Sequence, residues 1–511
     1  MEIPYYLKIG HAGDLESKEE RIVYRLLEIM PGFLIWLTFS GMVLASFFWP
    51  KGAAIFIISF CFYWILRTFH YSFHLVAAYR KMRENLEIDW LDELNKLPAW
   101  RGIYHLVVLP MYKEGLEIVM GTMEALVNSD YPKDKMIVAL AIEERAGRGA
   151  KEIAEIVSRE FGGKFYRFLV TCHPQNITGE IAGKGSNETW AGRQVKEKII
   201  DPLAIPYENV IVSCFDIDTR VYPRYFSCLS FHYLTVKGAE RASFQPIPLY
   251  LNNVWQAPFF SRVVAFSNFF WQALQQQRPE KIITYSSHSM SFKALVEMDF
   301  WQTNVVSEDA GIFWKAFLFY GGDYQTIPFH YPVSMDCVLS RGIKETAINQ
   351  YKQQRRWAFG SEGIPYLLFG FLKNKKIPFE KKFRYGFLTI EGFWAWGTNS
   401  FLILLLGWLP LVLGGEHFTG TSLAYNLPAL TRNMMTVALA GLFICVAISL
   451  KTIFLAPNPP RRPRKLVMLA QWLFFPVGLI IFGSIPSIDA QTRLMLGKYL
   501  GFSVTEKTRK I

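Results

Sequence analysis

Residues 209–218 read NVIVSCFDID, a short apolar run that ends directly in two aspartates. The run is rich in β-branched and other apolar side chains, which is typical of a strand buried on both faces of a sheet. Helix-like segments at residues 115–127 and 150–161 separate further runs of this kind. This alternation predicts an α/β domain with a mainly parallel sheet, whose ligands bind at the carboxyl ends of the strands. The other predicted strands are residues 105–109 (HLVVL), 136–142 (MIVALAI) and 165–170 (FYRFLV).

Asp216 and Asp218 stand where such a ligand would bind, directly after the strand at residues 209–215. Side chains at positions i and i+2 of an extended chain project to the same side. Carboxylate oxygens at a strand end can hold a hard divalent cation beside a diphosphate, so the pair is a candidate metal site. A DxD pair is common, however, and a solvated pair of loop residues is the plain alternative.

Two further signals follow along the chain. Glu308 and Asp309 (VVSEDAGIF, residues 305–313) open a predicted helix, where acidic residues are often only cap and dipole partners. Residues 353–357 (QQRRW) precede an apolar segment, and Arg and Trp in such a place often serve as membrane anchors. Each signal alone has a plain explanation. Their occurrence in this order after an α/β start points to one functional site.

The composition indicates that the α/β domain belongs to a membrane protein. The 511 residues are 51% hydrophobic and 19% charged, with a net charge of +12, which excludes disorder and a small disulfide scaffold. The cluster Arg80, Lys81 and Arg83 follows the second apolar run, so the positive-inside rule places the α/β domain in the cytoplasm. No nucleic-acid recognition motif accompanies the charge, which favours anionic lipid as its partner. Apolar runs of membrane length lie near residues 32–49, 53–76, 386–414, 435–455 and 466–485.

These runs divide the chain into five parts, with the α/β domain inserted between membrane helices. The short apolar segment 364–372 is predicted as an interfacial helix, with a buried core helix as the alternative. Residues 415–432 are predicted as an external loop and residues 459–465 (PPRRPRK) as a cytoplasmic one. Pro476 leaves open whether the last apolar run crosses the membrane or forms a re-entrant hairpin. The predicted parts are 1–83 (N-terminal segment and helical hairpin), 84–360 (α/β domain), 361–385 (interfacial helix region), 386–490 (about three membrane segments) and 491–511 (basic tail).

The motifs together resemble those of family 2 glycosyltransferases, and more closely the membrane-embedded branch that includes cellulose, hyaluronan, chitin and mannan synthases. They are VVLPMYKE (residues 107–114), DID (216–218), SED (307–309) and QQRRW (353–357). The resemblance implies a GT-A-type, Rossmann-like domain in a multi-pass protein of the cytoplasmic membrane. It implies inverting transfer of a sugar from a UDP- or GDP-sugar to a growing polysaccharide, with Mg²⁺ or Mn²⁺ as cofactor.

The resemblance also implies roles for single residues. Asp309 would be the general base beside Glu308, Asp218 would coordinate the metal with Asp216 next to it, and Trp357 would face the acceptor sugar. Where the family has an Asp pair after the second strand, this chain has Glu143 and Glu144, followed by Arg145, so the nucleotide base is not specified. The residues implied to bind the donor are Pro110, Tyr112, Glu114, Glu143, Lys184, Asp216, Gln353 and Arg356.

Two other functions are open at this point. A polyprenyl-phosphate or other lipid-linked glycosyltransferase that adds single sugars would share the domain and the membrane helices, but it gives no reason for QQRRW. A transporter with a nucleotide-binding regulatory domain is more remote. The chain has no GxxxxGK[ST] motif, and Glu391 is the ionisable residue that stands out in its apolar runs.

Overall fold

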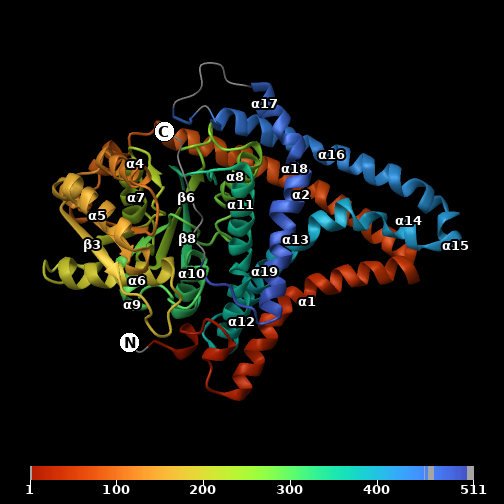
Figure 1. Cartoon of the computed structure of the whole chain (residues 1–511), viewed down its shortest axis with the longest axis horizontal. Helices are drawn as coiled ribbons and strands as arrows, with labels where there is room; N and C mark the ends of the chain where they lie inside the picture. The colour runs from red at the N-terminus through yellow and green to blue at the C-terminus, as the bar shows by residue number, and fades with distance from the viewer. Residues whose placement is uncertain (1–2, 454, 458–464, 503–511) are drawn as a thin grey trace.

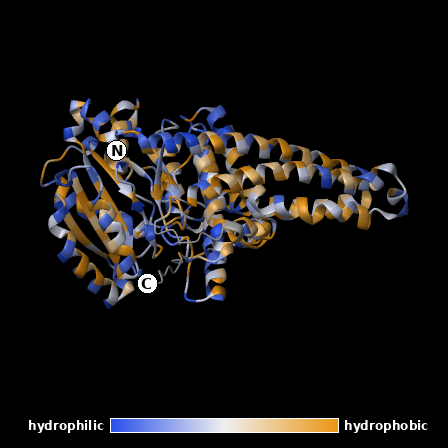
Figure 2. Ribbon diagram, turned by 90° about the horizontal axis from the view of Figure 1, so that it is seen from above, coloured by the Kyte–Doolittle hydropathy of each residue, from blue (hydrophilic) through white to orange (hydrophobic). Residues whose placement is uncertain are grey.

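The computed structural model describes residues 3–453, 455–457 and 465–502. An α/β domain forms one end of the molecule, and long helices project from it toward the other end (Figure 1). Figure 2 shows that the projecting helices carry mainly apolar residues, whereas the outer helices of the α/β domain are mixed. Most of the predicted cytoplasmic loop at 459–465 and the end of the predicted basic tail, residues 503–511, lie outside the described residues.

The described part of the α/β domain is built on one eight-stranded sheet in the order β3-β2-β1-β4-β7-β6-β8-β5. The neighbours β3, β2, β1 and β4 are parallel, as are β6 and β8. Strand β7 is antiparallel to both β4 and β6, and β5 is antiparallel to β8. The strands are β1 (Tyr104–Met111), β2 (Met136–Glu143), β3 (Arg167–His173), β4 (Val210–Cys214), β5 (Arg220–Val221), β6 (Ala242–Leu249), β7 (Ser289–Ser291) and β8 (Gln325–Ser334).

The four predicted strands are confirmed as β1 to β4, although β3 begins at Arg167, two residues later than expected. The sheet as a whole is mixed, so the expectation of a mainly parallel sheet is wrong for its second half. The sequence pattern could not show this, because β7 consists of Ser289, Met290 and Ser291. Three residues, two of them serine, carry no hydrophobic run.

Helices cover both faces of the sheet, because strands such as β1 present apolar side chains on both faces. Val107 and Leu109 pack into one apolar core, whereas Leu106 and Val108 pack into the other, because successive side chains of a strand alternate. The two predicted helices are confirmed as α4 and α5. The first face carries α3 (Trp90–Asn95), α4 (Leu116–Val127), α5 (Arg148–Phe161) and α7 (Tyr225–Thr235); the second carries α6 (Lys184–Val195), α9 (Phe292–Glu297) and α10 (Glu308–Phe319).

The register of the parallel strands brings their carboxyl ends to one edge of the sheet. Pro110 of β1 lies opposite Ala141 of β2, and Val108 lies opposite Cys214 of β4. The segments that follow these three strands therefore begin side by side. Ligands of parallel sheets bind at such an edge, next to the point where the chain leaves the strands.

Four described helical runs are long and apolar enough to cross a membrane, and a bent pair of helices gives a fifth. The bent pair is α13 (Phe379–Leu404) with residues Leu406–Leu413, which contain α14 (Leu409–Leu413), at an angle of 49°. Glu391 of α13 forms an ion pair with Arg67 of α2, at 2.5 Å. The other four runs are α1 (Lys18–Phe48), α2 (Pro50–Glu87), α16 (Ser422–Ile453) and the run Val467–Met495.

The C-terminal runs differ from the prediction at one place and bear on a question that the sequence left open at another. Residues 415–432, predicted as a loop, contain α15 (Gly415–Thr419) and the first turns of α16. The run around Pro476 stays helical through α17 (Lys465–Ala470), α18 (Phe475–Leu479) and α19 (Ile485–Met495), so it counts as one candidate span. Pro476 lies in the first turn of α18, where a missing backbone N–H is tolerated.

The predicted interfacial helix is α12 (Gly363–Lys373), but most of its apolar side chains are covered by protein, with Leu372 exposed, which favours the alternative of a buried core helix. Leu367 is fully buried, and Tyr366 and Phe371 belong to the core on the α10 face of the sheet. The apolar pattern suggested a lipid surface because sequence alone cannot distinguish a partner helix from lipid. The chain also contains the helices α8 (Phe259–Gln275) and α11 (Ile343–Ala358).

Candidate active site

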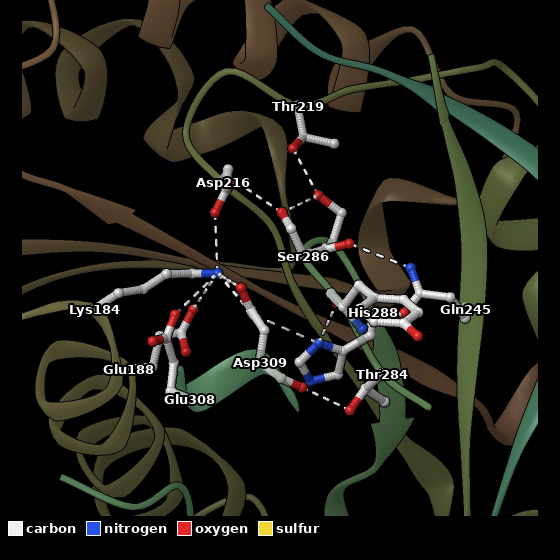
Figure 3. A network of polar contacts seen from close by, with 12 residues as sticks. Lys184, Glu188, Asp216, Thr219, Gln245, Thr284, Ser286, His288, Glu308 and Asp309 are labelled. Atoms are coloured by element: carbon white, nitrogen blue, oxygen red, sulfur yellow. Dashed lines mark hydrogen bonds and ion pairs between the residues drawn. The ribbon is translucent and has the colours of Figure 1, made fainter. Parts of the chain in front are cut away.

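Four carboxylates surround the ammonium group of Lys184 (Figure 3). Its Nζ lies 2.8 and 3.0 Å from the two carboxylate oxygens of Asp309 and 2.9 Å from Oδ1 of Asp216. Glu188 and Glu308 each place one oxygen 3.6 Å from the same nitrogen. The lysine side chain is 8% exposed, whereas those of Asp216 and Asp309 are 30% and 22% exposed, so the cluster is open only on the aspartate side.

The cluster forms because three chain segments end or begin at the same place. Asp216 follows the end of β4, Lys184 opens α6, and Asp309 lies in the first turn of α10. Gly185 allows the starts of α6 and α10 to touch. A Cβ atom at this position would lie 2.8 Å from the carbonyl oxygen of Gln302 and 3.0 Å from Cβ of Glu308.

The cluster holds more acid groups than its one cation can neutralise. Burial opposes the charge of Lys184, but Asp216 and Asp309 outweigh it and raise the pKa of the ammonium well above its usual value. Burial raises the pKa of Glu188 well above its ordinary range. Burial and the neighbouring Asp309 raise the pKa of Glu308 to about 7. The lysine is therefore charged at neutral pH, and burial favours the protonated forms of Glu188 and Glu308.

The two aspartates of the DID motif turn to different partners. Asp216 accepts a hydrogen bond from the hydroxyl of Ser286 at 2.7 Å, in addition to its contact with Lys184. Asp218 is 1% exposed, and its Oδ2 accepts from the backbone N–H of Asp336 at 2.8 Å. The prediction assumed an extended chain here, which is wrong. Residues 217–218 lie in a turn, closed by a 2.8 Å hydrogen bond from the N–H of Thr219 to the carbonyl of Asp216.

The described residues contain no group of three or more His, Cys, Asp or Glu side chains that could hold a metal ion. A Mg²⁺ ion of the kind found beside diphosphates needs fewer protein ligands, because it keeps waters and takes one or two carboxylates together with the substrate phosphates. Carboxylate oxygens are donors of the type that such an ion takes, so the residue types of Asp216 and Asp218 fit this more limited set, although the two side chains have different partners in this structure.

The ends of β1 and β2 build a second part of the edge. The backbone N–H of Tyr112 donates to Oε2 of Glu114 at 2.7 Å, and Pro110 is half-buried at the end of β1. The guanidinium of Arg145 lies over the ring of Tyr112, 4.5 Å from its centre, and donates to Oε1 of Glu143 at 3.1 Å. Glu143 is 5% exposed, so its carboxylate is already engaged by Arg145.

The QQRRW segment lies on the last turns of α11, which pack against α19. Arg355 donates to Asp489 of α19 at 3.0 Å. Arg356 is half-buried, with its guanidinium 4.7 Å from the ring centre of Phe502, and its charge lowers the pKa of Glu308. Gln353 is buried and accepts from Gln350 of the same helix, while Trp357 is half-buried. Arg356 is therefore the member of the motif that acts electrostatically on the carboxylate cluster.

Four residues of the site were not predicted from the sequence. The sequence pattern assigned no role to Arg145. Its position directly after two carboxylates at a strand end was a signal of an ion pair at the site. Glu188 lies one helical turn after Lys184, and that i,i+4 spacing was its signal. Ser286 and Gln245 left no signal in the sequence, because their partners are distant along the chain. The Oε1 of Gln245 accepts from the N–H of Tyr285 at 2.8 Å, which positions Ser286 against Asp216.

His288 completes the wall of the cluster. It is 1% exposed, its Nδ1 lies 3.0 Å from the carbonyl of Tyr285, and the same nitrogen lies 3.8 Å from Oδ1 of Asp309. Burial lowers the pKa of this imidazole, so it is neutral at pH 7. The carbonyl contact assigns the proton to Nδ1, because a carbonyl oxygen can only accept.

Comparisons with known proteins find only remote structural similarity. No protein-family model matches the chain, and no curated protein matches it. Mannosyltransferase PcManGT from Pyrobaculum calidifontis, solved in complex with GDP-Man and Mn²⁺, aligns with 87% of this chain and 100% of that chain, at 13% identity and a TM-score of 0.41. TarS 1-349 from S. aureus aligns with 78% of this chain and 93% of that chain, at 9% identity and a TM-score of 0.36, both without a named ligand and in complex with UDP-GlcNAc. Likeness at this level assigns no activity, so the function of the chain has to be inferred from its own residues.

Proposed function

We propose that the protein is an integral membrane glycosyltransferase that moves a sugar, with inversion, from a UDP- or GDP-sugar to a growing polysaccharide. The observation that carries this proposal is the meeting of Asp216 and Asp309 on one lysine, although they are far apart in sequence. A sugar hydroxyl needs a base, and a leaving diphosphate needs cations. The partly exposed carboxylate of Asp309 can serve as the base, and the buried ammonium of Lys184 beside it supplies a cation.

In this mechanism Asp309 accepts the proton of the acceptor hydroxyl as the oxygen attacks the anomeric carbon of the donor. The bond between that carbon and the diphosphate oxygen breaks, and the nucleoside diphosphate leaves with the electron pair. Direct displacement by one nucleophile inverts the anomeric centre, so no covalent enzyme intermediate is needed. One carboxylate base is sufficient for this chemistry.

The charge of the leaving diphosphate has to be neutralised by groups at the same edge of the sheet. Lys184 contacts Asp309, and the charge of Arg356 acts on Glu308, so we assign both cations this role. When bound, Mg²⁺ or Mn²⁺ held by Asp218, with Asp216 beside it, would neutralise further phosphate charge. Gln353 would contact the donor phosphates and Trp357 the acceptor sugar.

Lys184 also gives donor binding a consequence for the base. In the structure its ammonium contacts both oxygens of Asp309, so both are engaged by the lysine. A donor diphosphate that attracts Lys184 would release Asp309 for the acceptor hydroxyl. The enzyme would then activate its base only when a donor is present.

The proposal is tested by measuring nucleotide release from a panel of UDP- and GDP-sugars by the detergent-purified protein with Mn²⁺ or Mg²⁺. We expect release from one donor, together with a product of many sugar units. A single-sugar lipid product would favour the polyprenyl-phosphate alternative instead. No release from any donor, with oligosaccharide and polyprenyl-phosphate primers supplied, would contradict the proposal.

The segment after β2 gives a second prediction. Pro110, Tyr112, Glu114 and Glu143 would form the nucleotide pocket, and Arg145 would shape it by lying over Tyr112. Arg145→Ala removes this contact and leaves the buried Glu143 without its cation. We expect the donor KM to rise about tenfold, which corresponds to about 1.4 kcal/mol of lost binding, with little change in kcat.

The matched control is Arg148→Ala. Arg148 lies three residues further on, is 91% exposed and pairs with the exposed Glu152, so its loss should leave both constants unchanged. Equal effects of the two substitutions, or a fall in kcat at constant KM, would contradict a role of Arg145 in the nucleotide pocket.

A further inference from the structure

Glu362 holds the backbone directly in front of Glu308 and Asp309. One of its oxygens, Oε1, accepts hydrogen bonds from the N–H of Val306 at 2.9 Å and from the N–H of Ser307 at 2.8 Å. The side chain of Ser307 makes no capping hydrogen bond to α10 and interacts with the carboxyl group of Glu362 instead. The two contacts of Glu362 therefore define how the chain enters the helix that carries the proposed base.

Val306 also packs in an apolar cluster with Ala358 and Phe359, but the other described hydrogen bonds from this segment to distant parts of the chain lie earlier in it. The carbonyl of Thr303 accepts from the N–H of Ile181 at 2.7 Å, and the side chain of Asn304 donates to the carbonyl of Lys8 at 2.9 Å. These bonds fix residues 303 and 304 but leave two residues before Ser307. The contacts with Glu362 are the ones that reach to the start of α10.

Glu362 is joined to the QQRRW segment by one short helix. It is the last residue of the turn Phe359–Glu362, which continues α11 directly after Ala358. Gly360 of this turn lies close enough to Ser307 that a Cβ atom would be 3.3 Å from the serine Oγ. A shift at the end of α11 would therefore move the backbone in front of Glu308.

The surroundings of Glu362 favour a neutral acid. It lines a small cavity of about 20 Å³ together with Ser307, Gly363 and Tyr366. Burial raises the pKa of Glu362 to about 8, with Glu308 adding to the effect, although the two backbone N–H groups oppose it. At pH 7 the side chain can thus accept both hydrogen bonds without adding a negative charge next to Glu308.

We propose that Glu362 is a positioning residue for Glu308 and Asp309, and that it couples their placement to the QQRRW helix. The kinetic consequence rests on the proposed function, whereas the structural one does not. A misplacement of about 1 Å at a reacting group can lower a rate roughly 100-fold. Glu362 would act on the rate through Asp309 and would not touch donor or acceptor.

The first test needs no activity. Hydrogen–deuterium exchange of the full-length protein in detergent should show the segment 305–308 exchanging about tenfold faster in Glu362→Ala, because two hydrogen bonds are lost. Glu362→Gln keeps an oxygen that accepts both bonds and should exchange like the wild type. The control is Glu345→Ala, at an exposed position in the first turn of α11.

The second test is the rate of nucleotide release. We expect Glu362→Ala to lower kcat at least tenfold at an unchanged donor KM, and Glu362→Gln to restore kcat to within twofold at pH 7. Above about pH 8 the wild type should lose rate as Glu362 ionises beside Glu308, and Glu362→Gln should not show this loss.

The proposal is overturned if Glu362→Ala exchanges and turns over like the wild type, or if Glu362→Gln is as impaired as Glu362→Ala. A wild type that releases no nucleotide would contradict the proposed function instead. In that case the exchange experiment still decides whether Glu362 positions the start of α10.

Discussion

Asp309→Asn is expected to lower sugar transfer by about 10²- to 10⁴-fold, which is the range that general-base catalysis contributes. The amide retains the shape of the carboxylate but cannot accept the proton of the acceptor hydroxyl. The measurement is the initial rate of nucleotide release at saturating donor, compared with that of wild-type protein purified in the same way and at the same concentration.

The substitution should leave the fold intact. Lys184 keeps its 2.9 Å contact with Asp216, whose carboxylate still compensates its charge. The control is Asp323→Asn, at an exposed aspartate that pairs with Arg241 directly before β8 and β6 begin. A mutant at Asp309 that transfers sugar at the wild-type rate would contradict its role as the base.

Lys184→Met is expected to have the largest effect on stability, about 3–5 kcal/mol, because it removes the one cation that touches four carboxyl groups. Methionine fills a similar volume, so the loss would report the charge and not a cavity. The measurement is thermal unfolding of the purified protein, followed by tryptophan fluorescence at several pH values.

The sign of the pH dependence follows from Glu308. Its pKa is about 7 in the folded protein, against an ordinary value of 4.5, so the folded state binds the proton more tightly. The stability linked to this group is present below about pH 4.5 and is lost as the pH rises through 7. Lys184 lowers the pKa of Glu308, so this pKa rises further without the lysine, and the difference between mutant and wild type should grow from pH 5 to pH 8.

The control is Lys293→Met, which removes a surface ion pair with Glu240 and should cost less than about 1 kcal/mol at any of these pH values. A destabilisation by Lys184→Met that matches this control, or one that shrinks as the pH rises, would show that the cluster is not held together by the lysine.

Much of the fold could be predicted because burial leaves a periodic signal. The strands β1 to β4 and the helices α4 and α5 begin and end within a few residues of the predicted positions, whereas each membrane-length helical run matches its predicted apolar run at one end and extends well beyond it at the other. The strand β7 left no such signal, since Ser289 and Ser291 are polar and its pairing partners β4 and β6 are distant in sequence. The segment of α12 gave an apolar signal that does not distinguish protein from lipid.

The sequence by itself determined the α/β domain between apolar helices and the residue types of the site, because hydrophobic periodicity and local motifs are properties of short segments. Only the tertiary structure decided that Lys184 joins Asp216 to Asp309, that Arg145 covers Tyr112 and that Glu362 holds the backbone before Glu308. These contacts join segments that are separate in the sequence, and they form only when strand register and helix packing bring the segments together. The distances and burial that then shift pKa values belong to that packing, so no single segment could reveal them.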